Sequence, residues 1–210
     1  MKVYVFYTAK IQKFIDILQE SSKEIEGAEL VPELHEIEYD HCELGQTNGE
    51  GYLELCLQSH LYKLKIMKEN MGSNIVFLDA DIVFNKNQNN FTKIITELLA
   101  ENDFLFQYDD NSGMCEGINL GIIAVKCNDQ AIALWEAHCL NISRIPPQHR
   151  VGGFPQTEFN LLIREWKDKI KFQHLSLDFG FLTDNCIVYH AIGVENKMSA
   201  LQNALKSFGQ

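Results

Sequence analysis

Two carboxylates, Asp79 and Asp81, interrupt the apolar segment 75–84, which reads IVFLDADIVF. Burying such charges without a partner is expensive, so we expect them at the carboxyl edge of a sheet, where open α/β sheets bind ligands. Side chains alternate along a strand, which would place Asp79 and Asp81 on the same side with Ala80 pointing away. Two convergent carboxylates suit a hard divalent cation that also takes phosphate oxygens as ligands.

His190 could complete this site, since a neutral imidazole is a good metal ligand and His190 follows another apolar strand. Gly193 would let the backbone approach a phosphate closely, and Lys197 would offset the charge of a diphosphate. A lone histidine after a strand is more often structural. Its order and its combination with the aspartates give it weight here.

Two other interpretations of the aspartate pair stay open. The aspartates can simply cap a turn or the start of a helix. The segment 79–83 also fits the pattern of haloacid-dehalogenase-type phosphatases, in which the first Asp is a nucleophile and the second an acid/base. In those enzymes this strand usually opens the fold, whereas two strand–helix units precede Asp79 here, and Asp109-Asp110 comes too early to be their final acidic cluster.

The elements that must position these residues follow from hydrophobic periodicity. Strands are predicted at 3–7, 30–37, 75–78, 104–108, 119–125 and 187–189. Helices are predicted near 11–18, 53–72, 91–100, 130–141 and 158–166, whereas the sequence does not decide whether 196–210 forms a surface helix. Alternation of strand and helix over the first eighty residues predicts an α/β fold with a mostly parallel sheet and helices on both faces.

Length and composition favour one compact domain spanning 1–210. The chain has 46% hydrophobic and 22% charged residues, an ordinary globular mix. A net charge of −11 without a cluster of Lys and Arg argues against nucleic acid as a partner. An anionic ligand of such a protein would need a divalent cation or a few local donors.

Six cysteines are scattered without a CxxC pair or a secretory segment, which indicates free thiols in a reducing compartment and therefore a cytoplasmic protein. No apolar run approaches the ~18 residues of a membrane span. The chain can still be part of a longer polypeptide.

Taken in order, these motifs resemble those of nucleotide-diphospho-sugar transferases, including glycogenin-like enzymes and small bacterial and viral glycosyltransferases such as those of chlorella viruses. The segment 117–122, GINLGI, is similar to the family's Asn-Thr-Gly strand, with Leu120 in place of Thr. The segment 188–193, VYHAIG, followed by Lys197, resembles the His-x-x-Gly…Lys element, although the Lys falls one residue later than in glycogenin-like enzymes. The resemblance implies the GT-A fold, Rossmann-like with a mixed, mostly parallel central sheet flanked by helices, in which 1–84 form the nucleotide-binding half and 85–210 the acceptor and metal-completing half.

The resemblance also implies roles. Asp79, Asp81 and His190 would bind Mn²⁺ or Mg²⁺. The donor-binding residues would be Thr8 beside the base, Lys63 or Lys65 near the aspartates, Asp79, Asn119, Gly121, Gly193 and Lys197. The expected reaction is transfer of a hexose-type sugar from a nucleotide-diphospho-sugar, by analogy a UDP-sugar, to a glycan or another hydroxyl acceptor, and host cytoplasm is the expected compartment if the protein is viral. A non-catalytic nucleotide-sugar-binding module is a third alternative.

On the acceptor side, Gln156, Phe159 and Asn160 match the family's Asp-Gln-x-x-Leu-Asn element, with Pro155 where the Asp is expected. The catalytic candidates are Gln156 and Glu158. Inverting enzymes need a carboxylate to deprotonate the acceptor, and Glu158 offers one; equally, Glu158 could complement the dipole of a helix that Thr157 caps. The loop 144–155 and the pair 109–110 are candidates for substrate contact.

The other histidines show no mutual metal-ligand spacing, and we interpret them as structural or surface residues: His35, His41, His60, His138, His149 and His174. Trp135 and Trp166 sit in helical patterns and are expected in the core.

Overall fold

The structure, a computed structural model, describes residues 1–36, 50–109, 116–146 and 154–209. Its strands are β1 (Lys2–Tyr7), β2 (Glu29–Leu34), β3 (Asn74–Leu78), β4 (Ile82–Phe84), β5 (Phe104–Tyr108), β6 (Ile118–Lys126), β7 (Phe172–His174), β8 (Phe179–Gly180) and β9 (Val188–His190). Its helices are the 3₁₀ turn η1 (Ala9–Ile11), α1 (Gln12–Ser22), α2 (Glu50–Glu69), α3 (Phe91–Leu99), α4 (Asp129–Arg144), α5 (Phe154–Trp166) and α6 (Lys197–Ser207).

The central sheet has the strand order β2-β1-β3-β6-β5-β7. Strand β6 is antiparallel to both of its neighbours, while the other neighbouring pairs are parallel. The prediction of a mixed, mostly parallel sheet is therefore confirmed. Because β6 runs the other way, its first residues lie beside the carboxyl ends of β3 and β5, at the edge where ligands bind in such sheets.

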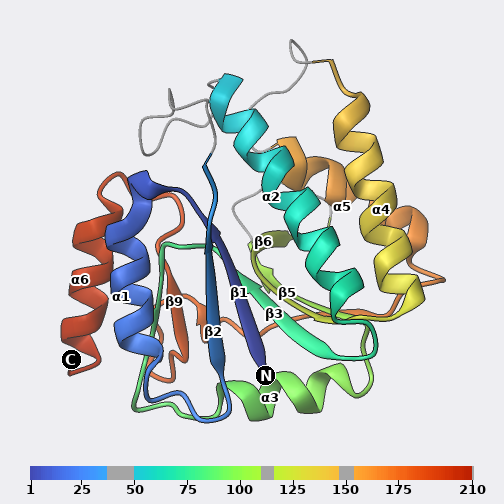
Figure 1. The fold of residues 1–210 in the computed structure, drawn as a ribbon. Coiled ribbons are helices and arrows are strands. Elements are labelled where there is room, and N and C mark those ends of the chain that lie inside the picture. The colour runs from blue at the N-terminus through green and yellow to red at the C-terminus, as the bar shows by residue number, and fades with distance from the viewer. Residues whose placement is uncertain (37–49, 110–115, 147–153, 210) are drawn as a thin grey trace.

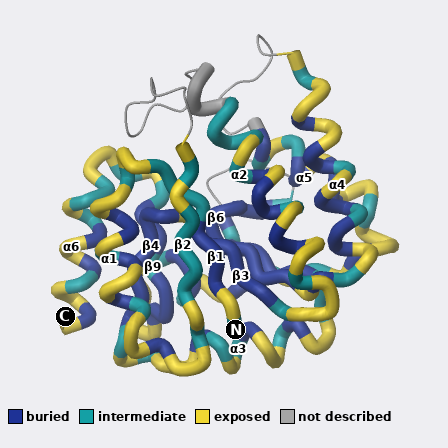
Figure 2. Tube along the Cα trace, in the orientation of Figure 1, coloured by how far each residue is buried: buried dark blue, intermediate teal, exposed yellow. Residues whose placement is uncertain are grey.

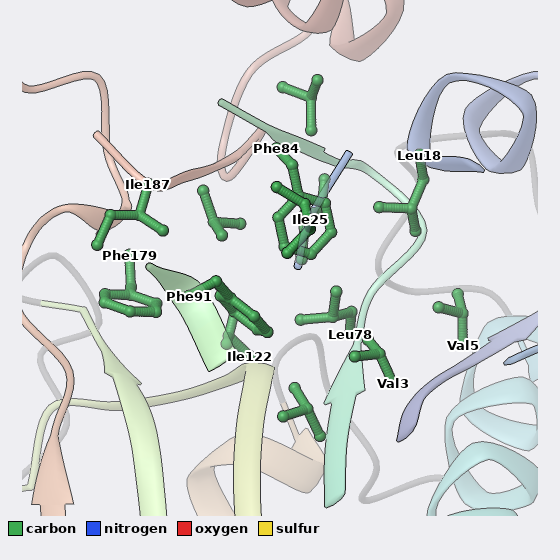
Figure 3. Packing of buried hydrophobic residues seen from close by; sticks show 14 of the residues in the cluster. Val3, Val5, Leu18, Ile25, Leu78, Phe84, Phe91, Ile122, Phe179 and Ile187 are labelled. Atoms are coloured by element: carbon green, nitrogen blue, oxygen red, sulfur yellow. The ribbon is translucent and has the colours of Figure 1, made fainter. Parts of the chain in front are cut away.

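Side-chain alternation splits the core between the two faces of this sheet. Val3 and Val5 of β1 point into one cluster, which α1, α3 and α6 cover, while Tyr4 points into the other, which α2, α4 and α5 cover. Figure 2 shows the buried strands between helices whose outer surfaces are exposed. Figure 3 shows the first cluster, to which Leu18 of α1, Leu78 of β3 and Phe91 of α3 all contribute.

A second, three-stranded sheet in the order β4-β9-β8 was not predicted. Strand β9 overlaps the strand predicted at 187–189, but β4 and β8 are only three and two residues long, and no local pattern reveals how the three strands pair. The pairing of β4 with β9 is antiparallel and joins segments that lie far apart in the sequence. This small sheet is what carries His190 to the aspartates.

Helix α5 begins at Phe154, four residues earlier than predicted. Pro155 hid this start, since proline usually marks a break, yet it is tolerated in the first turn of a helix, where the backbone N–H has no intrahelical partner. The segment that the sequence left open near the C-terminus forms α6, which packs against the first core cluster through Leu201 and Ala204.

Candidate active site

Asp79, Asp81 and His190 converge at the carboxyl end of β3. The Nε2 atom of His190 lies 3.2 Å from Oδ1 of Asp81 and 3.8 Å from Oδ2 of Asp79. His190 and Asp81 are buried, whereas the side chain of Asp79 is 49% exposed. The cluster therefore has a closed side, formed by the histidine and Asp81, and an open side at Asp79.

The chain brings these groups together by leaving one sheet for the other. Strand β3 ends at Leu78, the backbone N–H of Asp79 donates to the carbonyl of Gly121 at 2.8 Å, and β4 begins at Ile82. In the small sheet Ile82 pairs with His190. The predicted convergence of the carboxylates is thus found, but the predicted cause is wrong: the aspartates follow the strand, in a bend, instead of alternating along it.

The charges of this cluster support one another. Burial alone would raise the pKa of Asp81, but His190 and Lys197 outweigh it and lower that pKa. Burial alone would lower the pKa of His190, but Asp81 and then Asp79 outweigh it and raise that pKa. Each group thus favours the charged form of its neighbour.

Two lysines interact with the charges of the cluster. Lys197, the first residue of α6, donates a hydrogen bond to Oδ2 of Asp81. Lys63 of α2 is buried; burial lowers its pKa, and the carboxylate of Asp79 opposes that shift. Lys65 is exposed and faces Glu69 at 3.9 Å. Of the two lysines that the sequence left open, Lys63 is the buried one, and it interacts electrostatically with Asp79.

The donor set fits a divalent cation. One ligand atom each from Asp79, Asp81 and His190 lie within 4.8 Å of one another. Two carboxylate oxygens with one imidazole nitrogen suit Mn²⁺, and the oxygens suit Mg²⁺. The exposed side of Asp79 leaves room for further oxygen ligands from a bound molecule.

Asn119 and Gly121 of β6 line the inner wall of the same site. The side-chain oxygen of Asn119 accepts the N–H of Gly121 at 2.8 Å, and its nitrogen donates to Asp109 at 3.3 Å. A Cβ atom on Gly121 would lie 2.1 Å from Cε1 of His190, so only glycine leaves room for that imidazole ring. The sequence suggested a donor-binding role for Gly121 without this contact with the histidine.

Helix α5 holds the start of β6 through two amides. Oε1 of Gln156 accepts the N–H of Leu120 at 3.1 Å. Asn160 is buried and bonds both the N–H and the carbonyl of Ile118, at 3.1 and 3.0 Å. The two amides stand four residues apart on one helix face, so the matched motif anchors the strand that carries Asn119.

A sequence profile of nucleotide-diphospho-sugar transferases matches residues 61–207, a span that includes the aspartates, His190 and Lys197. The chain belongs to this family. It is therefore a glycosyltransferase, and the phosphatase alternative is wrong. No curated protein sequence matches the chain significantly.

Solved structures share the fold of this nucleotide-diphospho-sugar transferase at low sequence identity. A glycosyltransferase involved in the glycosylation of the major capsid of PBCV-1 has 14% identity and a TM-score of 0.59, over 96% of this chain and 98% of that one. GlyE of Streptococcus pneumoniae has 12% identity and a TM-score of 0.64, over 99% of this chain and 63% of that one. The galactosyltransferase LgtC has 12% identity and a TM-score of 0.55, over 100% and 95%. The predicted GT-A fold is confirmed.

The other predicted site residues differ in how they lie relative to the Asp79, Asp81 and His190 cluster. Thr8 directly follows β1, which neighbours β3, and so lies at the same sheet edge. Gly193 has a φ of +65° in the turn before α6, and a Cβ added there would meet nothing within 4 Å. Glu158 is two residues from both Gln156 and Asn160, a spacing that turns it away from their helix face. The suggestion that Thr157 caps the helix is wrong, because α5 starts before it.

Sequence reasoning missed Gln107 of β5. Its Oε1 lies 2.8 Å from Nδ1 of His190, and the side chain is fully buried. The available signal was one polar residue in the otherwise apolar strand that precedes Tyr108. Trp135 is in the core as expected, and Trp166 packs partly buried against it.

Several residues singled out in the sequence fall outside the described ranges: Asp110, His41, His149 and most of the predicted substrate-contact loop at 147–153. None of the described helices combines the length and apolar character needed to cross a membrane.

Proposed function

We propose that this transferase uses a divalent cation, Mn²⁺ or Mg²⁺, to hold a nucleotide-diphospho-sugar and moves a hexose-type sugar to a hydroxyl of a glycan or a similar acceptor. UDP is the proposed nucleotide. LgtC, a galactosyltransferase whose structure holds donor and acceptor sugar analogs, supports a hexose donor by its shared fold. The PBCV-1 enzyme, which is involved in the glycosylation of a capsid protein, supports a glycan-building role in the same way.

One observation carries the proposal: Asp79, Asp81 and His190 present three ligand atoms within 4.8 Å at the carboxyl edge of the sheet. A cation bound there would neutralise charge on the diphosphate as it leaves. The half-exposed Asp79 faces the side from which a diphosphate would approach.

Residues around the cation site would then bind the donor. Lys197 lies at the start of α6, where its ammonium can reach both Asp81 and a diphosphate next to it. Gly193, in an open turn a few residues before it, lets the backbone approach a phosphate oxygen. Lys63 would offset negative charge next to Asp79. Thr8 would contact the base from the end of β1.

Asn119, Gly121 and Gln156 would border the transferred sugar. The amide oxygens of Asn119 and Gln156 accept backbone N–H groups, and the nitrogen of Asn119 donates to Asp109, so these contacts hold both side chains in place. Gln156, which contacts β6 through the N–H of Leu120, is proposed as a catalytic residue. Glu158 is the proposed general base of an inverting reaction, with the acceptor hydroxyl as the proton donor; because Glu158 lies on another face of α5 than Gln156, the acceptor would have to reach it on that face.

The test is calorimetric titration of UDP and GDP, each with and without Mn²⁺, on the native protein and on Asp81→Ala. We expect Mn²⁺-dependent binding of UDP that Asp81→Ala abolishes. Asp129→Ala is the matched control, since Asp129 is an exposed aspartate in the first turn of α4. Equal binding with and without Mn²⁺, or unchanged binding by Asp81→Ala, would refute the cation site.

Lys63→Met and Lys65→Met form a second matched pair on one helix. Lys63→Met should weaken UDP binding about 10- to 150-fold, because a charge-assisted contact is worth roughly 1.5–3 kcal/mol, whereas Lys65→Met should leave it unchanged. Similar effects of both variants would mean that general helix charge, and not the buried ammonium, attracts the nucleotide.

The non-catalytic module is distinguished by turnover. A transferase with a competent site slowly hydrolyses its donor even without an acceptor, so UDP release from UDP-glucose or UDP-galactose reports the chemistry. Donor binding with no release of UDP from any hexose conjugate would favour the module.

A further inference from the structure

Gln107 sits where His190 must be held in place. Its side chain is fully buried, and its Oε1 lies 2.8 Å from Nδ1 of the imidazole. The other ring nitrogen, Nε2, faces Oδ1 of Asp81 at 3.2 Å. The histidine is thus contacted from opposite sides by an amide oxygen and a carboxylate.

An irregularity between β5 and β6 makes this contact possible. Phe106 of β5 pairs with Ile123, but the next residue, Gln107, pairs with Asn119. Within the skipped part of β6, Ile122 pairs with Leu78 of β3. Bulges of this kind are common next to active sites, where they redirect a side chain.

Two glycines leave the room that the pair occupies. A Cβ on Gly121 would lie 2.1 Å from Cε1 of His190, and a Cβ on Gly180 would lie 2.0 Å from Nε2 of Gln107. Gly180 also has a φ of +127°, a conformation that other residues rarely adopt. The backbone is therefore shaped around both side chains, from β6 on one side and β8 on the other.

The chemistry of the contact fixes the proton of the ring. An amide oxygen only accepts, so the hydrogen bond requires a hydrogen on Nδ1. In a neutral imidazole, Nε2 then carries the lone pair, directed toward Asp79 and Asp81, as a metal ligand must. An amide placed the other way, with its nitrogen toward the ring, would favour the opposite tautomer and direct an N–H at the cation site.

The nitrogen of the same amide makes Gln107 unfavourable for stability alone. Nε2 of Gln107 is buried and has no hydrogen-bond partner among the described residues. A buried, unpaired donor is unfavourable, and an apolar side chain of equal length would avoid it. Stability alone therefore does not explain a glutamine in this strand, whereas the contact of its oxygen with His190 does.

We propose that Gln107 is a positioning residue of the cation site: its oxygen holds Nδ1–H of His190 and so presents Nε2 to the cation between Asp79 and Asp81. This inference rests on the proposed function, because it requires that His190 binds a cation. Gln107 itself touches neither cation nor substrate.

Gln107→Met and Gln107→Glu test the assignment. Methionine keeps the length of the side chain without a strong acceptor, and glutamate restores an acceptor oxygen. Mn²⁺ affinity is measured from the electron paramagnetic resonance signal of free Mn²⁺, with and without UDP. We expect Gln107→Met to weaken Mn²⁺ binding about 10- to 100-fold, the usual effect of losing such a contact, and Gln107→Glu to stay within a few-fold of the native protein.

Nitrogen-15 chemical shifts of the imidazole give a readout that packing alone would not change. At a pH above the raised pKa of His190, where the ring is neutral, the native protein should show hydrogen on Nδ1, and Gln107→Met should shift the population toward hydrogen on Nε2. His190→Gln assigns the signals by their disappearance. Thermal unfolding of each variant shows whether it is folded, and Gln107→Glu remains informative if the methionine variant is not.

The outcomes separate the two proposals. If the native protein binds no Mn²⁺ with or without UDP, the proposed function fails and this inference fails with it. If the native protein binds Mn²⁺ and a folded Gln107→Met binds it equally well with an unchanged tautomer, only the role of Gln107 is refuted. Equal weakening by Met and Glu would likewise refute it, because it would indicate packing.

Discussion

Buried His138 should make the transferase sensitive to acid. Its ring packs against Trp135 and Phe159, with centroids 5.5 and 5.1 Å away, and its Nε2 lies 3.3 Å from Nδ1 of His60. Burial, with a smaller contribution from Lys63, lowers the pKa of His138 from 6.5 to about 3. The folded protein therefore keeps this histidine neutral at a pH where the unfolded chain protonates it.

The sign and size of the effect follow from proton linkage. Between pH 6.5 and 3 the unfolded state binds more protons than the folded state at this site, so stability falls as the pH falls. Each pH unit inside that window costs ~1.4 kcal/mol. From pH 7 to pH 5, about 1.5 units of the window are crossed, and His138 should lower the free energy of unfolding by about 2 kcal/mol.

Urea unfolding of the native protein and of His138→Leu at pH 7 and pH 5 measures this difference. The variant is expected to be less stable at pH 7 but to lose about 2 kcal/mol less than the native protein on acidification. His190, whose raised pKa contributes stability at low pH and loses it as the pH rises, is present in both proteins. Because His138 contacts His60 and helps to lower its pKa, the difference between the two proteins reports the His138–His60 pair. Equal losses in the two proteins would show that His138 is protonated in the folded state and would refute the reasoning.

Three further predictions concern the site. Gly121→Ala should displace the His190 ring, weakening Mn²⁺ binding at least tenfold and costing about 1–3 kcal/mol of stability through overpacking; calorimetry and urea unfolding report the two effects, and unchanged Mn²⁺ binding would mean that the ring can shift freely. Asn160→Ala should cost about 3 kcal/mol in urea unfolding, because it leaves the buried N–H and carbonyl of Ile118 unpaired. Glu158→Gln should abolish transfer while leaving UDP affinity intact if Glu158 is the base, and unchanged turnover would remove it from the mechanism.

The large sheet could be predicted because its strands carry their own signal. Segments such as IVFL before Asp79 are long and apolar enough to be recognised locally, and their order along the chain predicts parallel pairing. The carboxyl edge of such a sheet is a known ligand site, so Asp79 and Asp81 could be assigned to it from the sequence. The register of β6 relative to β3, by contrast, depends on tertiary contacts.

The contacts of the site were less predictable for the same physical reason. His190 reaches Asp81 through the pairing of two three-residue strands, β4 and β9; the sequence predicted a strand at 187–189, but no local pattern reveals its pairing with β4. The helical spacing could not decide between Lys63 and Lys65, because both lie in one helix and only packing shows which is buried. Gln107 was missed since a polar residue in a strand reveals nothing of its partner.

The site lies at the junction of the two sheets. Its geometry therefore depends on the packing of the core cluster beneath α1, α3 and α6. Asp79 and Gly121 belong to the edge of the large sheet, whereas His190 comes from the small one. The small sheet has too few backbone hydrogen bonds to be stable alone. It is held by buried apolar residues such as Phe84 and Val188, which pack in the cluster beneath α1, α3 and α6. A loss of packing in that cluster would therefore move His190 relative to Asp79.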